Sequence, residues 1–220
     1  MSNYPSKREA FRAALALALT AALVCTALLL EPLSTSVYLA LLPETAQLTG
    51  IHHLADVAVA TLGVTYATAL WRSRLAAASL TRGVVAGIGV GVAYLVSEVA
   101  KLAFMQERPC REALVLERCP APGDWSFPSN HMTIAVGLAV ASAAALPHVT
   151  RPLVATLTAL VAAVGAGRLG QGAHYPHDLL AGMGIGLGMV VAAAVTLGPL
   201  AESSRLLTRW SKPAGREPGE

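Results

Sequence analysis

The sequence predicts an all-α integral membrane protein built as a bundle of six transmembrane helices. Of its 220 residues, 55% are hydrophobic and 13% are charged, which is a low charged fraction even for a soluble protein with a large core. The apolar residues form blocks that reach or approach the ~20 residues needed to cross ~30 Å of hydrocarbon. Because these blocks are rich in Ala, Leu, Val and Gly and lack the alternation of strands, we interpret them as helices.

The predicted spans lie, in order, at residues 11–30, 54–71, 84–105, 132–146, 153–166 and 179–200. The first does not resemble a removable signal peptide, since Glu31 and Pro32 follow it instead of a small-residue cleavage site. The fourth and fifth are short and need part of their flanking loops to complete a crossing. The Gly-rich sixth block (AGMGIGLGMV) predicts a close packing face between helices.

Basic residues alternate between successive connecting segments. The first loop, 31–51, has none, whereas the N-terminus, the second and fourth loops and the tail carry Lys7, Arg8, Arg12, Arg72, Arg74, Arg82, Arg151, Arg205, Arg209, Lys212 and Arg216. The positive-inside rule therefore places both termini in the cytoplasm and loops one, three and five outside. Four arginines in outward loops break this bias, so we expect another role for them: Arg108, Arg111, Arg118 and Arg168.

These observations define the domain organisation. Residues 1–10 are a predicted cytoplasmic segment, 11–204 the membrane domain, and 205–220 a basic, disordered cytoplasmic tail. The net charge of +3 is explained by cytoplasmic anchoring and gives no support for nucleic-acid binding. The composition, rich in Ala, Gly and Arg, indicates a GC-rich coding sequence, and we expect a multi-pass protein of a bacterial plasma (inner) membrane.

Two cysteines, Cys110 and Cys119, lie in the predicted outward third loop. An oxidising compartment permits a disulfide there, and we predict one; the alternative is two free thiols, because a disulfide also needs suitable Cβ geometry. The CxxC spacing typical of zinc sites is absent from the sequence.

Polar residues cluster at the predicted outward ends of the spans. Lys101 and Arg108 are seven residues apart, about 10.5 Å along one helix face, and Pro109 is expected to end that helix at Arg108. Lys101 could instead be a snorkelling side chain. Glu98 is either the ion-pair partner of Lys101 or part of a headgroup pocket.

The fourth span opens with Pro128, Ser129, Asn130 and His131, which could be a helix cap or a site. Near the start of the sixth span, Asp178 could orient His174 as a nucleophile or could only cap the helix or complement its dipole. Pro176 fits the first turn of that helix. His177 is expected to lie in a loop or at the interface, with contact to the substrate as the minority interpretation. The trio His52, His53 and Asp56 is also expected at the interface, with a wall of the same site as its minority interpretation.

The predicted topology brings these residues to one membrane face. Lys101, Arg108 and Arg168 gather there with two histidines, a serine, a carboxylate and two helix N-termini. Cationic side chains and helix N-termini are the groups that bind a phosphate anion. The polar start of the fourth span is therefore predicted to be both a cap and a site.

Three segments resemble the motifs of the type-2 phosphatidic acid phosphatase family: KLAFMQERP matches K-x6-R-P, PSNH matches P-S-G-H, and GRLGQGAHYPHD matches S-R-x5-H-x3-D. They stand in the family's order between residues 101 and 178. Asn130 stands where the family has glycine, and Gly167 where it has serine. Glycine allows close backbone approach to phosphate, so we expect the first departure to alter rate or selectivity.

The resemblance implies a metal-independent membrane lipid phosphatase without a cofactor. It implies that His174 attacks phosphorus to form a phosphohistidine, that Asp178 orients it, and that His131 serves as acid and then base. It implies that the phosphate is bound by Lys101, Arg108, Ser129, Asn130 and Arg168. Its partners are then membrane lipids and a lipid substrate, either a polyprenyl diphosphate such as undecaprenyl diphosphate or a phospholipid phosphate such as phosphatidylglycerol phosphate. The alternative is a non-enzymatic lipid-phosphate carrier or transporter.

Overall fold

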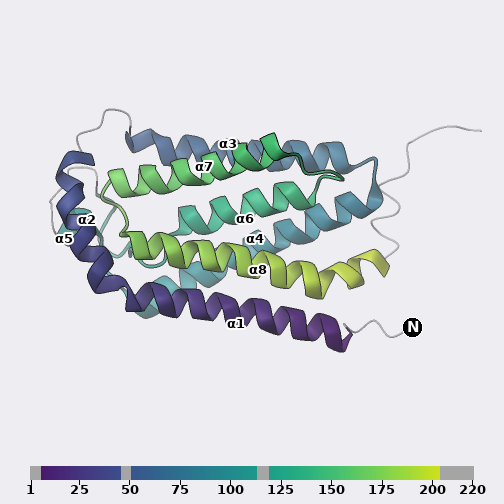
Figure 1. Cartoon of the computed structure of the whole chain (residues 1–220), viewed down its shortest axis with the longest axis horizontal. Helices are drawn as coiled ribbons and strands as arrows, with labels where there is room; N and C mark the ends of the chain where they lie inside the picture. Colours follow the sequence, from purple (N-terminus) through teal and green to yellow (C-terminus); the bar gives the residue numbers. More distant parts are fainter. Residues whose placement is uncertain (1–5, 46–50, 113–118, 204–220) are drawn as a thin grey trace, which may run out of the picture.

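A computed structural model of the chain describes residues 6–45, 51–112 and 119–203 (Figure 1). These residues form helices joined by short segments, without a strand among them. The helices are α1 (Lys7–Leu29), α2 (Glu31–Thr45), α3 (Ile51–Ser73), α4 (Ala77–Phe104), α5 (Pro109–Glu112), α6 (Asn130–Ala144), α7 (Arg151–Gly170) and α8 (Pro176–Ser203). The all-α prediction is confirmed. The predicted tail at 205–220 lies outside the described residues.

Helices α1, α3, α4, α6, α7 and α8 coincide with the six predicted spans. Among the described residues, α1, α3, α4, α7 and α8 are long and apolar enough to cross a membrane. Helix α6 has 15 residues and is only about 22 Å long at 1.5 Å per residue. The described helices are therefore those of a multi-pass membrane protein, with α6 shorter than a full span.

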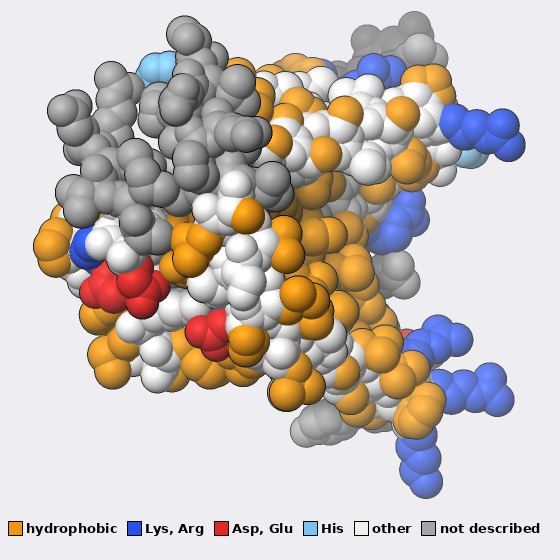
Figure 2. Space-filling view, turned by 60° about the vertical axis from the view of Figure 1, so that its left-hand side comes forward, with side chains coloured by type: hydrophobic (Ala, Val, Ile, Leu, Met, Phe, Trp, Pro, Cys, Tyr) orange, Lys and Arg blue, Asp and Glu red, His pale blue; other side chains and the backbone are white. Residues whose placement is uncertain are grey.

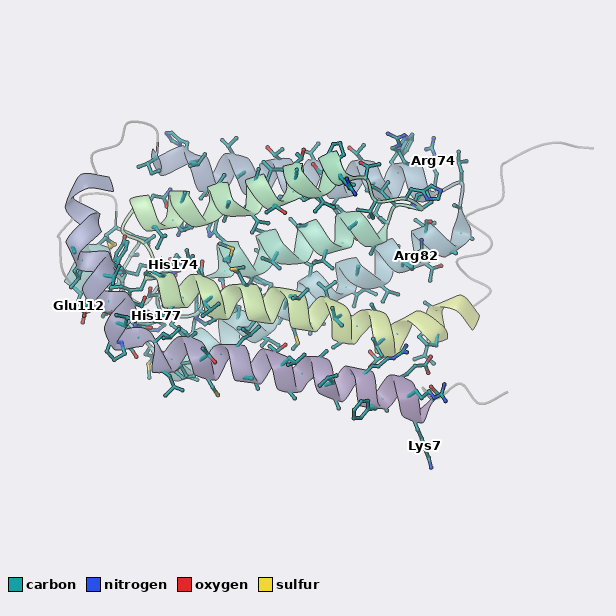
Figure 3. All side chains as sticks on the ribbon, in the orientation of Figure 1. Lys7, Arg74, Arg82, Glu112, His174 and His177 are labelled. Atoms are coloured by element: carbon teal, nitrogen blue, oxygen red, sulfur yellow. A yellow bond between two sulfur atoms is a disulfide. The ribbon has the colours of Figure 1, made fainter. Side chains whose placement is uncertain are left out.

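The long helices run side by side, so their ends meet at two opposite ends of the bundle (Figure 1). Lys7, Arg74 and Arg82 lie at one end, here called the basic end, and His174 and His177 lie at the other, here called the histidine end (Figure 3). Lys and Arg side chains project from the basic end, and a hydrophobic surface separates them from acidic side chains at the histidine end (Figure 2). Basic side chains gathered at one end, beyond a hydrophobic surface, are the pattern that the positive-inside rule describes for membrane proteins.

Helix α8 packs against α1, α4 and α6, and its glycines permit the close approach. A Cβ on Gly182 would lie 2.6 Å from the carbonyl oxygen of Ser129, at the start of α6. Side-chain atoms at Gly186 and Gly188 would collide with Thr133 of α6 and Thr20 of α1. The predicted packing face of the Gly-rich block is thus confirmed.

Helices α2 and α5 cover the histidine end (Figure 1). We expected the first loop, 31–51, to be a connection; most of it is helix α2, because Pro32 is tolerated in a first helical turn and Tyr38 packs inward. The Tyr38 ring lies edge-on to that of Tyr175, 5.6 Å between centroids, and its hydroxyl donates to the carbonyl of Leu169. Helix α2 is therefore fixed against the segment that carries His174.

The predicted disulfide is confirmed, since Cys110 and Cys119 are bonded with their Cα atoms 5.7 Å apart. Arg111 adds contacts beside it, donating to Glu107 and to the carbonyl of Pro120. The backbone N–H of Cys110 donates to the carbonyl of Gly172 at 2.9 Å, so the bridged segment is attached to the turn before His174.

Replacing Cys119 with serine is expected to lower the free energy of unfolding by about 2–3 kcal/mol. Without the disulfide, the unfolded chain gains the conformational entropy that a closed loop of this length removes. Denaturant unfolding in detergent, compared with a Cys25→Ser control outside the bridge, measures the difference. Equal midpoints for the Cys119→Ser variant and the control would contradict the prediction.

Candidate active site

A cavity of 350 Å³ opens at the histidine end. It is lined by Tyr94, Glu98, Lys101, Arg108, Asp124, Asn130, His131, Ile134, Arg168 and His174. Of the predicted site residues, Ser129 and Asp178 do not line it. Asp178 lies 3.4 Å from the lining residue His174, and Ser129 precedes the lining residue Asn130 in the chain. The sequence prediction that residues from 101 to 178 meet at one end of the bundle is therefore correct in its geometry.

Arg108 is the most completely held cation of the cavity, with 2% of its surface exposed. Its Nε donates to the carbonyl of Asp124 at 2.8 Å, and Nη1 donates to the carbonyl of Ala173 at 2.8 Å. The prediction that α4 continues to Arg108 is wrong: it ends at Phe104, because Met105 adopts left-handed backbone with φ 46°. The chain turns there, which lets Arg108 reach the same cavity as Lys101.

Asp124 is a functional candidate that sequence reasoning missed. Its Oδ1 accepts from Lys101 Nζ at 3.2 Å and from Arg108 Nη2 at 2.7 Å. Burial would raise the pKa of Asp124, but its hydrogen bonds and charge attraction to Arg108 and Lys101 hold that pKa below the usual value. The carboxylate is thus ionised at neutral pH and occupies donors that a phosphate would use. Its position, five residues before Ser129, was the available signal.

His174 lies between cations and a carboxylate. Its Nε2 is 3.2 Å from Arg108 Nη1 and faces the cavity, while Nδ1 is 3.4 Å from Asp178 Oδ2. Arginine can only donate, so Nε2 carries the lone pair, which faces Arg108 Nη1, and the ring proton is assigned to Nδ1, which has no hydrogen-bond partner among the described residues. Burial first, and then the charges of Arg108, Arg168 and Lys101, lower the pKa of His174 well below its usual value. The neutral, nucleophilic tautomer is therefore the stable one.

Asp178 is fully buried behind His174. Its Oδ2 accepts from Ser126 Oγ and from the Tyr175 backbone N–H at 2.8 Å. Accepting a backbone N–H at the start of α8 is a capping contact, so the cap interpretation is confirmed. The orienting role stays a prediction, which the 3.4 Å approach of His174 Nδ1 supports.

His177 is not the interface residue that we expected. It is 2% exposed in the first turn of α8, and its Nε2 lies 3.2 Å from Asp178 Oδ1 (Figure 3). Ser34 Oγ accepts the His177 backbone N–H and lies 3.0 Å from Nδ1. The serine proton can then bond to Nδ1, which leaves the ring proton on Nε2, where Gln106 Oε1 accepts it at 3.2 Å. His177 therefore lies beside the carboxylate of Asp178 without a hydrogen bond to its Oδ1 among the described residues.

Ser129 and Asn130 form the start of α6. Ser129 occupies the N-cap position, yet its side chain makes no capping bond, and the buried Oγ has no hydrogen-bond partner among the described residues. The prediction of a capping side chain is wrong here. Asn130 donates from Nδ2 to Glu98 and accepts from Ser97 Oγ at 2.6 Å. Its amide therefore holds Glu98. The interpretation of Glu98 as the ion-pair partner of Lys101 is wrong.

His131 and Arg168 complete the cavity. His131 Nε2 lies 3.2 Å from Asp56 Oδ1, so Asp56 contacts a lining residue without lining the cavity itself, and the minority interpretation stays a prediction. The side chain of His52 lies outside the described residues, and His53 is exposed. Arg168 donates to Gln171 at 2.7 Å, and its buried Nε lacks a partner among the described residues. Of the other outward arginines, Arg111 lies outside the cavity and Arg118 outside the described residues.

The departure at Gly167 has a packing reason. A Cβ there would lie 2.6 Å from the backbone nitrogen of Ala55 and 3.0 Å from its Cβ. Glycine therefore brings α7 and α3 together at the point where the next residues, Arg168 and Asp56, enter the site.

Replacing Gly167 with serine is expected to push α3 away and lower the free energy of unfolding by about 1–3 kcal/mol, the usual range for overpacking. Thermal unfolding in detergent measures it, with Gly63→Ser as the control because a Cβ at Gly63 meets no atom within 4 Å. Unchanged stability in Gly167→Ser would show that the two helices are not in close contact.

Replacing Asp124 with asparagine is expected to tighten vanadate binding about fivefold, since one charge at 4 Å contributes ~1 kcal/mol in water. Arg108 stays in place because two backbone carbonyls hold it. Inhibition constants for vanadate against both proteins measure the change, with Glu112→Gln as the comparison, because Glu112 lies at the same end of the bundle but does not line this cavity. Weaker vanadate binding in Asp124→Asn would mean that Asp124 positions the cations and does not compete for them.

Comparisons with known proteins agree with the motifs. The model of the PAP2 superfamily matches residues 82–200. Two curated relatives, each named decaprenylphosphoryl-5-phosphoribose phosphatase, come from Mycobacterium tuberculosis strains CDC 1551 / Oshkosh and ATCC 25618 / H37Rv. Each is 34% identical over 113 residues, covering 50% of this chain and 58% of the relative. The chain thus spans little more than half the length of these relatives. No solved structure matches it.

Proposed function

We propose that this chain, which belongs to the PAP2 superfamily, is an integral-membrane phosphatase that hydrolyses a lipid phosphate through a phosphohistidine. The observation that carries the proposal is the placement of His174, with Nδ1 toward Asp178 and the Nε2 lone pair toward a cavity lined by Lys101, Arg108 and Arg168. Phosphate binding alone needs cations but no oriented nucleophile.

In the first step, the Nε2 lone pair of His174 attacks phosphorus and the bond from phosphorus to the leaving oxygen breaks. Charge on the transferred phosphoryl oxygens is stabilised by Lys101, Arg108 and Arg168 and by the N-terminus of α6. Ser129 contributes its hydroxyl, which has no hydrogen-bond partner among the described residues, and Asp178 stabilises the imidazolium that forms. The roles of these residues are those that the resemblance implied.

His131 serves both steps. It first donates a proton to the leaving oxygen and then accepts one from the water that attacks phosphorus, breaking the bond to His174 and releasing phosphate. Asn130 differs from the role we first gave it: its Nδ2 is bonded to Glu98, so its contribution to phosphate binding is through the backbone at the start of α6.

We further propose that the chain crosses the membrane six times, with α6 completing its crossing through the segment before Asn130. Both termini are then cytoplasmic, and the histidine end faces the outside of a bacterial plasma membrane. The basic end supports this orientation, because Lys7, Arg74 and Arg82 lie there (Figure 3).

The substrate class is a membrane lipid that carries a phosphate. The relatives are named for a polyprenyl phosphosugar, which adds a third candidate to polyprenyl diphosphates and phospholipid phosphates. The non-enzymatic carrier remains the alternative function, and the oriented lone pair of His174 argues against it.

The test is phosphate release by purified protein in detergent, with EDTA present, from prenyl monophosphates, prenyl diphosphates and phospholipid phosphates. We expect release from at least one class and inhibition by vanadate, which adopts the geometry of phosphoryl transfer. Release that is lost in EDTA and restored only by Mg²⁺ would contradict the metal-independent mechanism. Binding of lipid phosphate without release would favour the carrier.

A further inference from the structure

The cavity contains carboxylates as well as cations. Glu98 lines it together with Lys101, which lies three residues later on α4. Lys101 nevertheless pairs with Asp124, and Glu98 forms no ion pair within 4 Å among the described residues. Its negative charge is therefore available to whatever occupies the cavity.

Asn130 fixes the Glu98 side chain. The amide donates through Nδ2 to Glu98 Oε1, while its Oδ1 accepts from the buried Ser97 Oγ. Both ends of the amide are thus engaged, and the carboxylate is held at the start of α6. Glycine at position 130 could not do this, so the departure from the family motif has a direct consequence for the charge of the cavity.

The second departure also places a carboxylate nearby. Gly167 admits the backbone of Ala55 to van der Waals distance, and the next residue of α3, Asp56, contacts His131 Nε2 at 3.2 Å. Glu98 and Asp56 therefore reach the neighbouring residues Asn130 and His131, whereas Arg108 lies on His174. Carboxylates thus lie near the proposed proton donor as well as near the nucleophile, where Asp124 pairs with Lys101 and Arg108. Glu98 differs from Asp124 in having no cation paired with it among the described residues.

The unpaired carboxylate of Glu98 acts on the leaving group. The second phosphate of a diphosphate is an anion and would lie beside the proton donor, where Glu98 and Asp56 repel it. An alcohol with free hydroxyl groups can instead donate hydrogen bonds to the Glu98 carboxylate, and charge-assisted bonds of this kind are among the stronger ones in proteins.

We propose that Glu98, held by Asn130, is the main specificity-determining residue of the site, with Asp56 as a second one. Together they select a phosphomonoester of a hydroxylated alcohol and reject a diphosphate. The inference rests on the proposed phosphatase function and chooses among its substrate classes.

The experiment compares two matched pairs of lipids with purified protein in detergent. Farnesyl phosphate and farnesyl diphosphate differ in the second phosphate, and lysophosphatidate and its analogue without the 2-hydroxyl differ in one donor. We expect kcat/KM to be about tenfold higher for the monophosphate and for the hydroxylated lipid. In Glu98→Gln both ratios should fall to near one, while the control Glu112→Gln, at the same end but outside this cavity, should retain them.

A second variant and a binding readout do not depend on the folding of Glu98→Gln or on turnover. Asn130→Gly should lower both ratios partially by releasing Glu98. Methylenediphosphonate should inhibit Glu98→Gln about tenfold more strongly than the unmodified protein, with little change in vanadate inhibition. A diphosphate preference in the unmodified protein, or ratios unaffected by Glu98→Gln and Asn130→Gly, would overturn the inference and leave the phosphatase proposal intact. Hydrolysis of none of the four lipids would overturn the phosphatase proposal itself.

Discussion

Replacing His174 with alanine is expected to abolish turnover and to leave no phosphoenzyme. The reason is that the nucleophilic lone pair is on His174 Nε2, which faces the cavity. Arg108 Nη1 lies 3.2 Å from this atom and attracts the phosphate anion toward it. Acid-quench trapping of protein labelled from a ³²P-substrate measures the intermediate, and free phosphate measures turnover. His177→Ala is the comparison, because His177 is buried behind Asp178 and does not line the cavity; it should slow the reaction but retain label.

The low pKa of His174 gives this prediction a pH dependence. A folded pKa well below the usual ~6.5 means that the imidazole stays neutral, and so nucleophilic, in mildly acidic solution. Phosphoenzyme formation should therefore become slower through protonation of His174 only well below that pH.

Label that persists in His174→Ala would show that another residue is the nucleophile.

The sequence predicted the helices and the gathering of the site because both depend on local signals. Apolar blocks of about a bilayer's thickness fix where spans begin and end, and alternating loop charges fix which ends meet. Lys101, Arg108, His131, Arg168 and His174 were therefore expected at one end of the bundle, and the cavity contains them.

The contacts within the site were less predictable, because they depend on which rotamers and turns the packing allows. Lys101 has Glu98 nearby in sequence and Asp124 nearby in space. The turn at Met105 brings Arg108 to the same cavity, where Asp124 forms ion pairs with both Lys101 and Arg108. In the same way, a helical spacing suggested Glu98 for Lys101, but Asn130 reaches Glu98 from another helix. Contacts between residues 32 positions apart leave no signal in a single sequence.

The two departures from the family motif show the same limit. From the sequence alone, Asn130 could only be described as the loss of a flexible glycine, and Gly167 as the loss of a serine hydroxyl. In the folded chain each has a physical use, since Asn130 anchors a carboxylate and Gly167 allows α3 to pack against α7. A substitution within a motif thus has to be interpreted with the residues that it contacts.

Replacing His131 with alanine is expected to have an effect that depends on the leaving group. General acid–base help contributes typically ~10²–10⁴-fold, so release of an alkyl alcohol from a lipid phosphate should fall by about that factor. A p-nitrophenolate leaving group hardly needs a proton, so His174 should still be phosphorylated by p-nitrophenyl phosphate. Because water then lacks its base, the phosphoenzyme should accumulate.

Rapid-quench measurement of p-nitrophenol and of labelled protein separates the two steps in His131→Ala: a burst of p-nitrophenol equal to the labelled protein, followed by slow release of phosphate. Asp56→Asn is the matched control, since it keeps the imidazole but removes the carboxylate 3.2 Å from it, and it should show no burst. If His131→Ala lacks labelled protein under these conditions, His131 is required for the attack itself. The assignment of nucleophile and proton donor to His174 and His131 would then have to be exchanged.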